Sequence, residues 1–308
     1  MSHPEQSRAA HGDAGAKLML VVLCIVWGIS WPLMRIALSE IPPFTMRTSS
    51  SLVGGVVLYG VCRFMGRKLY IPRGKARLHL VVAALLNVAS FSVFSTFAQL
   101  NAATSRVAIL AYTMPIWSVV LAWIFLRERP TGTQPIAIGL CAAGLSILIY
   151  PLTATGVPLG ILLALATGMS WAAGTVYLKW ARIGADPMAI AIWQVVVSFF
   201  VIATCMLVFE GGVDLHSAHA GGVTAMILSG ILGTGAAYGL WFSIITRLPA
   251  MTASLGVLGS PVIGVIASVI FLGERPTVTD VIGFVLILGA SALTLLSRPA
   301  TVEAAEHT

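Results

Sequence analysis

The chain has 308 residues, of which 58% are hydrophobic and only 9% are charged. Soluble domains carry about a quarter charged residues, so this sequence has too few polar groups to cover a water-soluble globule. The composition therefore excludes a soluble enzyme, a nucleic-acid-binding module and a disordered chain, and it leaves a polytopic membrane protein.

Apolar segments separated by short polar turns recur along the whole sequence. Each is close to the length of about 20 residues that a helix needs to cross the hydrocarbon core. The runs are continuous rather than alternating, which favours helices over barrel strands. The predicted spans are 17–38, 44–65, 78–100, 104–126, 134–151, 158–181, 188–210, 222–246, 251–272 and 278–297. Residues 1–16 and 298–308 are predicted to be solvated tails, and the N-terminus lacks the pattern of a cleaved signal peptide.

The lysines and arginines divide unevenly between the two sides that these spans define. With the N-terminus inside, all but four of the 18 basic residues fall on the cytoplasmic side, and the exceptions are Arg35, Arg47, Arg106 and Arg275. This is the positive-inside pattern, so both termini are predicted to be cytoplasmic, in a cell inner membrane. The basic loop 63–77 is explained by topology and by contact with anionic headgroups, so the net charge of +7 does not indicate nucleic-acid binding.

The cysteines and histidines form no recognisable site. The four cysteines stand singly and the six histidines are scattered, so no metal and no cofactor is expected. A membrane-embedded enzyme, such as a lipid-modifying transferase, would need a nucleophile, an acid–base pair or a metal cluster near one interface. Only His79 and scattered serines are available, so an enzyme is a remote alternative.

The sequence contains an internal repeat. Residues 115–133 (PIWSVVLAWIFLRERPTGT) match residues 261–279 (PVIGVIASVIFLGERPTVT) at ten of 19 positions. Upstream, Trp27 corresponds to Trp171 and Pro43 to Pro187. The chain is thus predicted to hold two five-helix units, 17–151 and 158–297, and the odd number of helices inverts the second unit in the membrane. Inverted-topology repeats are typical of secondary transporters.

Ten helices in two inverted groups of five, with a proline and an F-L-x-E-R-P-T turn in the fourth and ninth, resemble the drug/metabolite transporter superfamily. Within it the chain is similar to the EamA-type exporters, a group that includes exporters of aromatic amino acids. The resemblance covers residues 17–297, and its best motif copies are Pro115 with Glu128 and Pro261 with Glu274. It implies an all-α bundle around a central cavity, alternating access and a small-molecule substrate, which the fold alone does not name.

A transport site needs polar and aromatic side chains that face inward at membrane depth. Helical spacing and position along the spans nominate seven residues: Trp27, Asn87, Phe91, Tyr112, Trp171, Tyr238 and Trp241. The corresponding tryptophans either form a central pair or pack in the core or against lipid. Asn87 either faces the cavity or makes an interhelical hydrogen bond. If these residues converge, the cavity is expected to be aromatic and uncharged, suited to stacking rings or to weak binding of an organic cation.

The repeated motif adds four further candidates. Pro115 and Pro261 each remove a backbone donor, and each is either a tolerated kink or part of a gate. Glu128 and Glu274 lie at helix ends beside Arg129 and Arg275, which predicts local pairing and capping rather than proton coupling. Because no acid stands in the middle of a span, facilitated diffusion or exchange is favoured over a carboxylate proton relay.

The leading hypothesis is a secondary transporter that exports small organic metabolites, with amino acids as the best guess and aromatic ones as the narrower version. The alternative is efflux of aromatic or cationic toxicants. The expected partners are the small-molecule substrate and the lipid bilayer. The sequence does not determine the oligomeric state and is compatible with a monomer.

Overall fold

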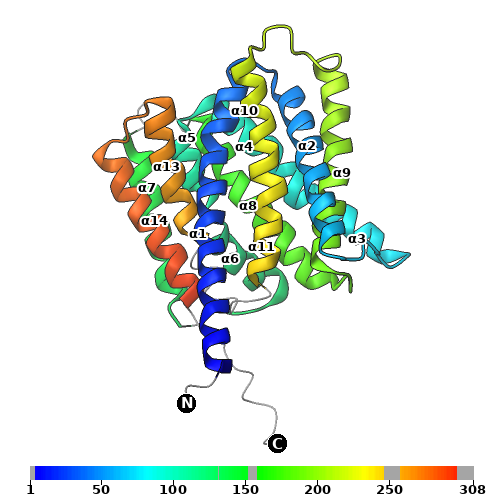
Figure 1. The fold of residues 1–308 in the computed structure, drawn as a ribbon. Helices are drawn as coiled ribbons and strands as arrows, with labels where there is room; N and C mark the ends of the chain where they lie inside the picture. Colours follow the sequence, from blue (N-terminus) through cyan, green and yellow to red (C-terminus); the bar gives the residue numbers. More distant parts are fainter. Residues whose placement is uncertain (1–3, 131, 152–157, 246–256, 297–308) are drawn as a thin grey trace, which may run out of the picture.

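The structure, a computed structural model, describes residues 4–130, 132–151, 158–245 and 257–296. All regular elements in this part of the chain are helices, which run along one another as a bundle (Figure 1). The prediction of an all-helical chain is confirmed.

The helices follow the apolar segments of the sequence. Those of the first half are α1 (Pro4–Leu38), α2 (Pro43–Phe64), α3 (Lys75–Ala84), the π-helical turn η1 (Leu85–Ala89), α4 (Ser90–Asn101), α5 (Thr104–Ala111), α6 (Met114–Leu126) and α7 (Gln134–Ile149). Those of the second half are α8 (Leu159–Ala181), α9 (Pro187–Phe209), α10 (Ala220–Gly230), the π-helical turn η3 (Ile231–Ala236), α11 (Ala237–Ile245), α13 (Gly259–Leu272) and α14 (Val278–Leu296).

The lengths and the outer surface of these helices suit a bilayer. Six helical segments in the described residues are long and apolar enough to cross a membrane, from Gly15–Leu38 to Ala220–Trp241, and α7, α13 and Val278–Leu293 are shorter apolar helices. Large apolar side chains such as Val56, Phe125 and Val285 are exposed on the outside of the bundle. An apolar exterior of this extent is what contact with lipid requires.

The predicted spans 17–38 and 104–126 agree within two residues with the membrane-length segments Gly15–Leu38 and Thr104–Leu126, but the helices there differ from the spans. The first helix begins at Pro4 rather than at residue 17, so residues 4–16 of the predicted tail continue α1. The predicted span 104–126 is divided between α5 and α6, because Tyr112 and Thr113 form a turn just before Pro115. The predicted tail 298–308 and the start of the predicted span 251–272 lie outside the described residues.

The two π-helical turns occupy corresponding places in the two halves. Leu85 begins η1 and Ile231 begins η3, a separation of 146 residues that equals the offset of the repeated turns. Each π turn packs closely on a neighbouring helix. A Cβ atom added at Gly174 of α8 would lie 2.4 Å from Cβ of Asn87 in η1, and one added at Gly54 of α2 would lie 2.6 Å from Cβ of Thr234 in η3. Because π turns interrupt the regular backbone pattern, they often mark functional sites.

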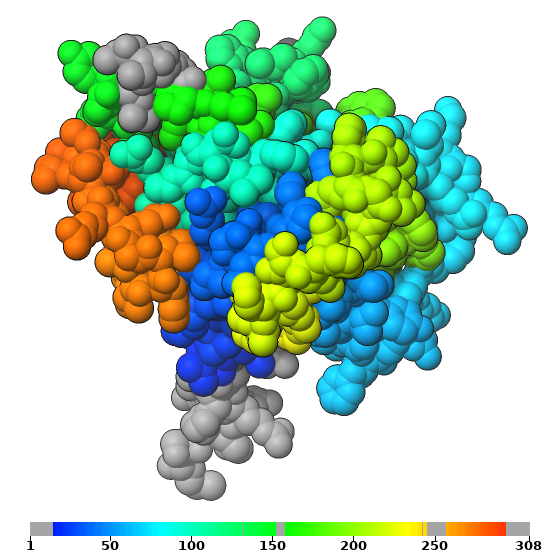
Figure 2. Space-filling view, turned by 90° about the horizontal axis from the view of Figure 1, so that it is seen from above, coloured from blue at the N-terminus to red at the C-terminus, as the bar shows by residue number. Residues whose placement is uncertain are grey.

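Helix α1 contacts elements of the second half on two sides. Seen from above, α1 lies between α13 on one side and α10 on the other, and it contacts both (Figure 2). On the far side of the bundle α4 packs along α8, and α7 packs along α14. The start of α1 and the end of α14 lie at the same end of the bundle (Figure 1).

Candidate functional site

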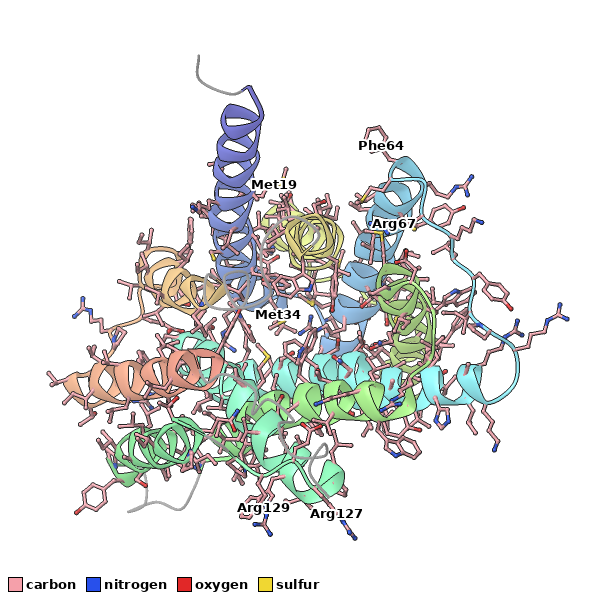
Figure 3. All side chains as sticks on the ribbon, turned by 90° about the horizontal axis from the view of Figure 1, so that it is seen from below. Met19, Met34, Phe64, Arg67, Arg127 and Arg129 are labelled. Carbon is pink, nitrogen blue, oxygen red and sulfur yellow. The ribbon has the colours of Figure 1, made fainter. Side chains whose placement is uncertain are left out.

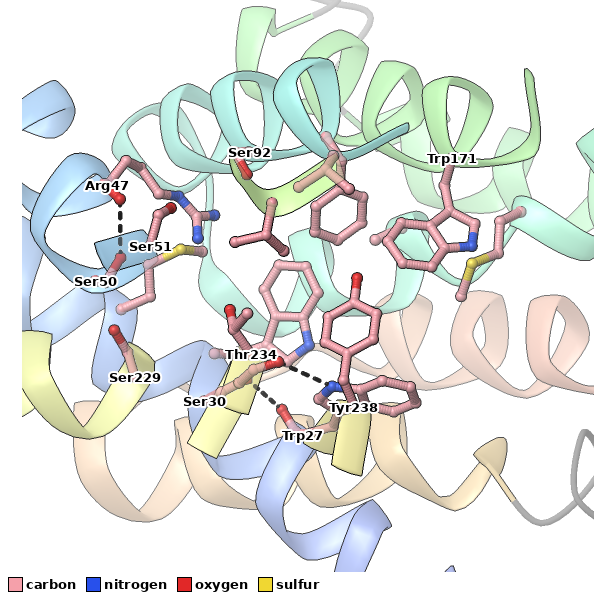
Figure 4. Close-up of a pocket in the computed structure, with 18 of the residues that line it drawn as sticks. Trp27, Ser30, Arg47, Ser50, Ser51, Ser92, Trp171, Ser229, Thr234 and Tyr238 are labelled. Atoms are coloured by element: carbon pink, nitrogen blue, oxygen red, sulfur yellow. Dashed lines mark hydrogen bonds between the residues drawn. The ribbon is translucent and has the colours of Figure 1, made fainter. Parts of the chain in front are cut away.

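A cavity lies inside the bundle, between helices of both halves. Its lining side chains come mainly from α1, α2, α4, the turn between α5 and α6, and the segment η3–α11, with Trp171 added from α8 (Figure 4). Its volume is about 150 Å³. That is on the order of ten times what one water molecule needs, so a molecule of roughly ten non-hydrogen atoms can be accommodated.

Five of the seven nominated residues line this one cavity: Trp27, Phe91, Tyr112, Trp171 and Tyr238. The rings of Phe91 and Trp171 meet edge to face with their centroids 5.2 Å apart. Trp31 completes this wall, with its ring centroid 6.4 Å from that of Phe91. The wall is therefore a set of aromatic faces and edges of the kind that hold a flat apolar group.

The other two nominated residues lie beside the cavity and are not part of its lining. Asn87 is buried within η1 against α8, and its side-chain oxygen has no hydrogen-bond partner among the described residues. Trp241 packs against Trp27, with ring centroids 6.3 Å apart and the ring planes tilted by 36°. It supports the position of Trp27 rather than adding a surface to the cavity.

The corresponding tryptophans both reach the cavity, but with different freedom. The indole nitrogen of Trp27 donates to the backbone oxygen of Gly233 at 3.1 Å, in the π turn η3. Within the described part of the chain, the indole nitrogen of Trp171 has no such partner, although its side chain also lines the cavity (Figure 4). Trp171 thus presents its ring to the cavity without a hydrogen bond from the described residues that fixes the indole nitrogen.

The expectation of an uncharged cavity is wrong, because Arg47 of α2 lines it. The guanidinium lies with Ser50, Ser51 and Ser92 at one end of the cavity, and Trp171 lies toward the other (Figure 4). Arg47 stands four residues from the start of its helix, where a long basic side chain ordinarily extends to the headgroups. The sequence signal for an inward position was the pair of serines three and four residues further on, which share its helix face.

The two prolines have different surroundings. Pro115 follows the turn at Tyr112 and Thr113 and stands at the second position of α6, where its missing N–H would have no helical partner anyway. The turn itself directs Tyr112 into the cavity. Pro261 is buried near the start of α13. The structure therefore shows a helix break just before Pro115, and residues 246–256, which precede α13, lie outside the described residues.

The expected pairing of Glu128 and Glu274 with the neighbouring arginines is wrong. Both oxygens of Glu128 accept from Nζ of Lys179 at 2.7 Å. Glu274 accepts from the backbone nitrogens of Thr104 and Ser105, at 2.6 and 2.9 Å. The turn after each helix directs the carboxylate toward a different segment of the chain. Next to Glu128, the side chain of Arg129 extends away from the bundle (Figure 3).

Residues suited to metal binding do not cluster in the described residues. No three histidine, cysteine, aspartate or glutamate side chains in that part of the chain lie close enough together to hold a metal ion. His79, the residue on which an embedded enzyme would depend, hydrogen-bonds through Nδ1 to the hydroxyl of Tyr177 at 2.8 Å and packs against Trp180. It belongs to an aromatic cluster rather than to an acid–base pair.

Comparison with known proteins identifies transporters along the whole chain. The sequence profile of the EamA-like transporter family matches residues 15–150 and 158–296. An uncharacterized transporter of Bacillus subtilis, YvbV, is 27% identical over 290 residues, which cover 90% of this chain and 90% of the relative. A probable amino-acid metabolite efflux pump of Escherichia coli is 23% identical over 89% of this chain and 92% of the relative. A solved crystal structure with 20% identity matches with a TM-score of 0.64 and covers 91% of this chain and 97% of that one, which shows a shared fold.

Proposed function

The chain belongs to the EamA-like transporter family, and from this premise we propose that it exports small organic metabolites, amino acids first among them, by alternating access. Its family makes the protein a multi-pass membrane transporter. The names of its relatives likewise indicate transport rather than enzymatic activity. The direction of transport, the substrate class and the transport cycle are the content of the proposal.

The transport cycle that we propose rests on two five-helix units of opposite orientation, 17–151 and 158–297. The repeated turn and the equal offset of η1 and η3 support this arrangement. The packing supports it as well: η1 contacts α8 and α9, while η3 contacts their counterparts α1 and α2. Two similar halves of opposite orientation can exchange conformations, which would open one central site first to one side and then to the other. The placement of both termini in the cytoplasm follows from the distribution of basic residues.

The observation that carries the substrate proposal is the division of the cavity into an aromatic wall and a polar end (Figure 4). A molecule that fits both has a ring at one end and a polar head at the other, which describes an aromatic amino acid. A similar relative is named a probable amino-acid metabolite efflux pump, and this name supports the same class. We therefore place aromatic amino acids at the head of the candidate substrates, bound in part by Trp27 and Trp171.

The proposal is tested with purified protein in proteoliposomes. Labelled phenylalanine, tyrosine and tryptophan are expected to enter vesicles that contain the protein faster than they enter vesicles without it. Trp171→Ala is expected to raise the substrate concentration for half-maximal flux about tenfold, because a large aromatic contact is lost.

Trp123→Ala is the matched control, because Trp123 lies on α6, is 51% exposed and does not line the cavity. This variant should transport as the unaltered protein does. No flux above empty vesicles for any of the 20 amino acids would overturn the amino-acid proposal. Unchanged flux in both Trp27→Ala and Trp171→Ala would remove the tryptophans from the site.

The second candidate function is efflux of aromatic toxicants, which the aromatic wall also favours. Cells with and without the gene would differ in their resistance to aromatic compounds under this alternative. Under the amino-acid proposal, the two kinds of cells would differ instead in their tolerance of amino acids, or of dipeptides that release amino acids.

A further inference from the structure

Arg47 is the single charged residue among the described residues that line the cavity. The other polar lining groups are neutral: the hydroxyls of serine, threonine and tyrosine and the indole N–H groups of tryptophan. No carboxylate of the described residues forms an ion pair with Arg47. The cavity therefore has a net positive charge that its own walls do not balance.

Neutral hydroxyls hold the guanidinium in place. Nε donates to Oγ1 of Thr96 and Nη2 donates to Oγ of Ser95, both at 2.6 Å. These hydroxyls in turn donate to the backbone oxygen of Ser92, at 2.7 Å from Thr96 and 3.2 Å from Ser95. The side chain is thus oriented from α4 without any compensation of its charge.

Two of the five N–H donors of a guanidinium are used in these bonds. Nη1 has no hydrogen-bond partner in the part of the chain that the structure describes. A cation with free donors in a largely apolar cavity is costly, and a bound anion lowers that cost. A carboxylate fits best, because its two oxygens match the planar fork of the guanidinium.

We infer that Arg47 binds the carboxylate of the transported molecule, and that an amino group on this molecule is dispensable. The inference rests on the proposed function, in which this cavity is the transport site. An ammonium group would find hydroxyls but no counter-ion among the described lining residues, whereas a carboxylate finds a cation. The substrate class is then aromatic carboxylates, of which aromatic amino acids are one part, and organic cations are excluded.

The repeat shows that this anchor belongs to one half alone. The position that corresponds to Arg47 at the offset of Trp27 and Trp171 is Ala191, which has no charge and no hydrogen-bonding side chain. The aromatic part of the cavity includes the corresponding residues Trp27 and Trp171, one from each half, whereas its charged end has Arg47 from the first half alone. A single anchor gives the bound molecule one orientation in the cavity.

The test compares three molecules with the same ring: phenylalanine, 3-phenylpropanoate and 2-phenylethylamine. Binding to the purified full chain in lipid nanodiscs is measured by calorimetry, and transport is measured in proteoliposomes. We expect the two carboxylates to bind and the amine to bind at least about tenfold more weakly, because charged hydrogen bonds are the strong ones.

Arg47→Gln is expected to weaken the binding of both carboxylates about tenfold or more, and to leave the binding of the amine unchanged or tighter. A general folding defect would weaken all three probes alike. Arg47→Lys keeps the positive charge but lacks the planar fork of the guanidinium. This variant should bind the carboxylates less tightly than the unaltered protein but still more tightly than the amine. Arg35→Gln is the matched control, because Arg35 donates to the backbone oxygen of Gln99 and does not line the cavity.

Equal binding of the amine and the carboxylates by the unaltered protein would overturn the inference and leave the proposed export of amino acids intact. The inference would also be overturned if Arg47→Gln weakened the binding of all three probes equally and Arg47→Lys abolished the difference in affinity between the carboxylates and the amine. Absence of binding and of flux for every probe would overturn the inference together with the proposed function.

Discussion

The sequence F-L-x-E-R-P-T occurs at the ends of α6 and α13, and the two copies have the same local shape but different partners. The third residue of each turn is left-handed, with φ of 57° at Arg127 and 67° at Gly273. The glutamate that follows Arg127 pairs with Lys179, and both side chains are about half exposed, at 49% and 62%. The glutamate that follows Gly273 instead caps the first turn of α5.

The difference teaches that the repeated sequence sets the turn, while the surrounding helices set the role of the carboxylate. The first backbone N–H groups of a helix have no partner within it and carry partial positive charge. Glu274 satisfies two of them in α5, across 170 residues of sequence. Among the described residues, the carboxylate of Glu128 meets only the exposed side chain of Lys179, and an ion pair at the surface contributes little.

A second contact strengthens the end of the bundle that holds Glu274. Arg106 of α5 donates to both oxygens of Asp280 in α14, at 2.6 and 3.0 Å. Both this ion pair and the cap by Glu274 join the first half of the chain to the second. Under the proposed alternating access, this end can open only when these contacts separate.

The largest effect is expected for Arg106→Gln. The change leaves the carboxylate of Asp280, whose side chain is 5% exposed, without its cation. Thr277 still donates to the same carboxylate through its backbone nitrogen and its hydroxyl, at 2.9 and 2.8 Å. The free energy of unfolding should therefore fall by about 2–3 kcal/mol, at or just below the range for buried pairs that lose one partner.

The measurement is thermal or denaturant unfolding of the purified variant in detergent. Arg67→Gln is the matched control, because the guanidinium of Arg67 makes one contact among the described residues, with Asp186 at 3.3 Å, and its side chain is 41% exposed. Its effect should stay under about 1 kcal/mol. Equal destabilisation by the two variants would show that the contact of Arg106 contributes no more than a surface pair.

The second effect is expected for Glu274→Gln, which keeps the shape of the cap and removes its charge. An amide oxygen can still accept one backbone hydrogen bond, but it is not an anion at the helix start. The free energy of unfolding should fall by about 1 kcal/mol, a typical value for loss of a helix cap. Backbone amide exchange at Thr104 and Ser105 should become faster, and unchanged exchange there would contradict the cap.

The positions of the helices can be predicted from the sequence because a bilayer fixes their length. Helices α2 and α9 begin and end within one residue of their predicted spans. The beginning of α1 cannot be predicted in this way, because residues 4–16 lack the apolar pattern of a membrane helix. Pro115 indicates a kink between α5 and α6, but it does not indicate the turn that directs Tyr112 inward.

The aromatic wall of the cavity can also be predicted, because aromatic side chains at mid-span share a helix face. This pattern nominates Phe91 and Tyr238, and both line the cavity. It does not nominate Arg47, whose charge serves to assign topology and whose direction depends on Ser95 and Thr96 of another helix. The local indication for Arg47 is the pair Ser50 and Ser51 on its helix face. Its partners Ser95 and Thr96 leave no local signal, and the same holds for Glu274 and the start of α5.

The smallest effect is expected for Glu128→Gln, the counterpart of Glu274→Gln in the other copy of the turn. Its only partner in the described residues is Lys179, whose side chain is 62% exposed, so water and salt already screen the pair. The free energy of unfolding should change by less than about 0.5 kcal/mol. What remains of the effect should vanish in high salt, whereas the effect of Glu274→Gln should largely persist, because its carboxylate contacts backbone groups at a helix start. A loss as large as that of Glu274→Gln would mean that the two turns act alike, and the comparison between them would then fail.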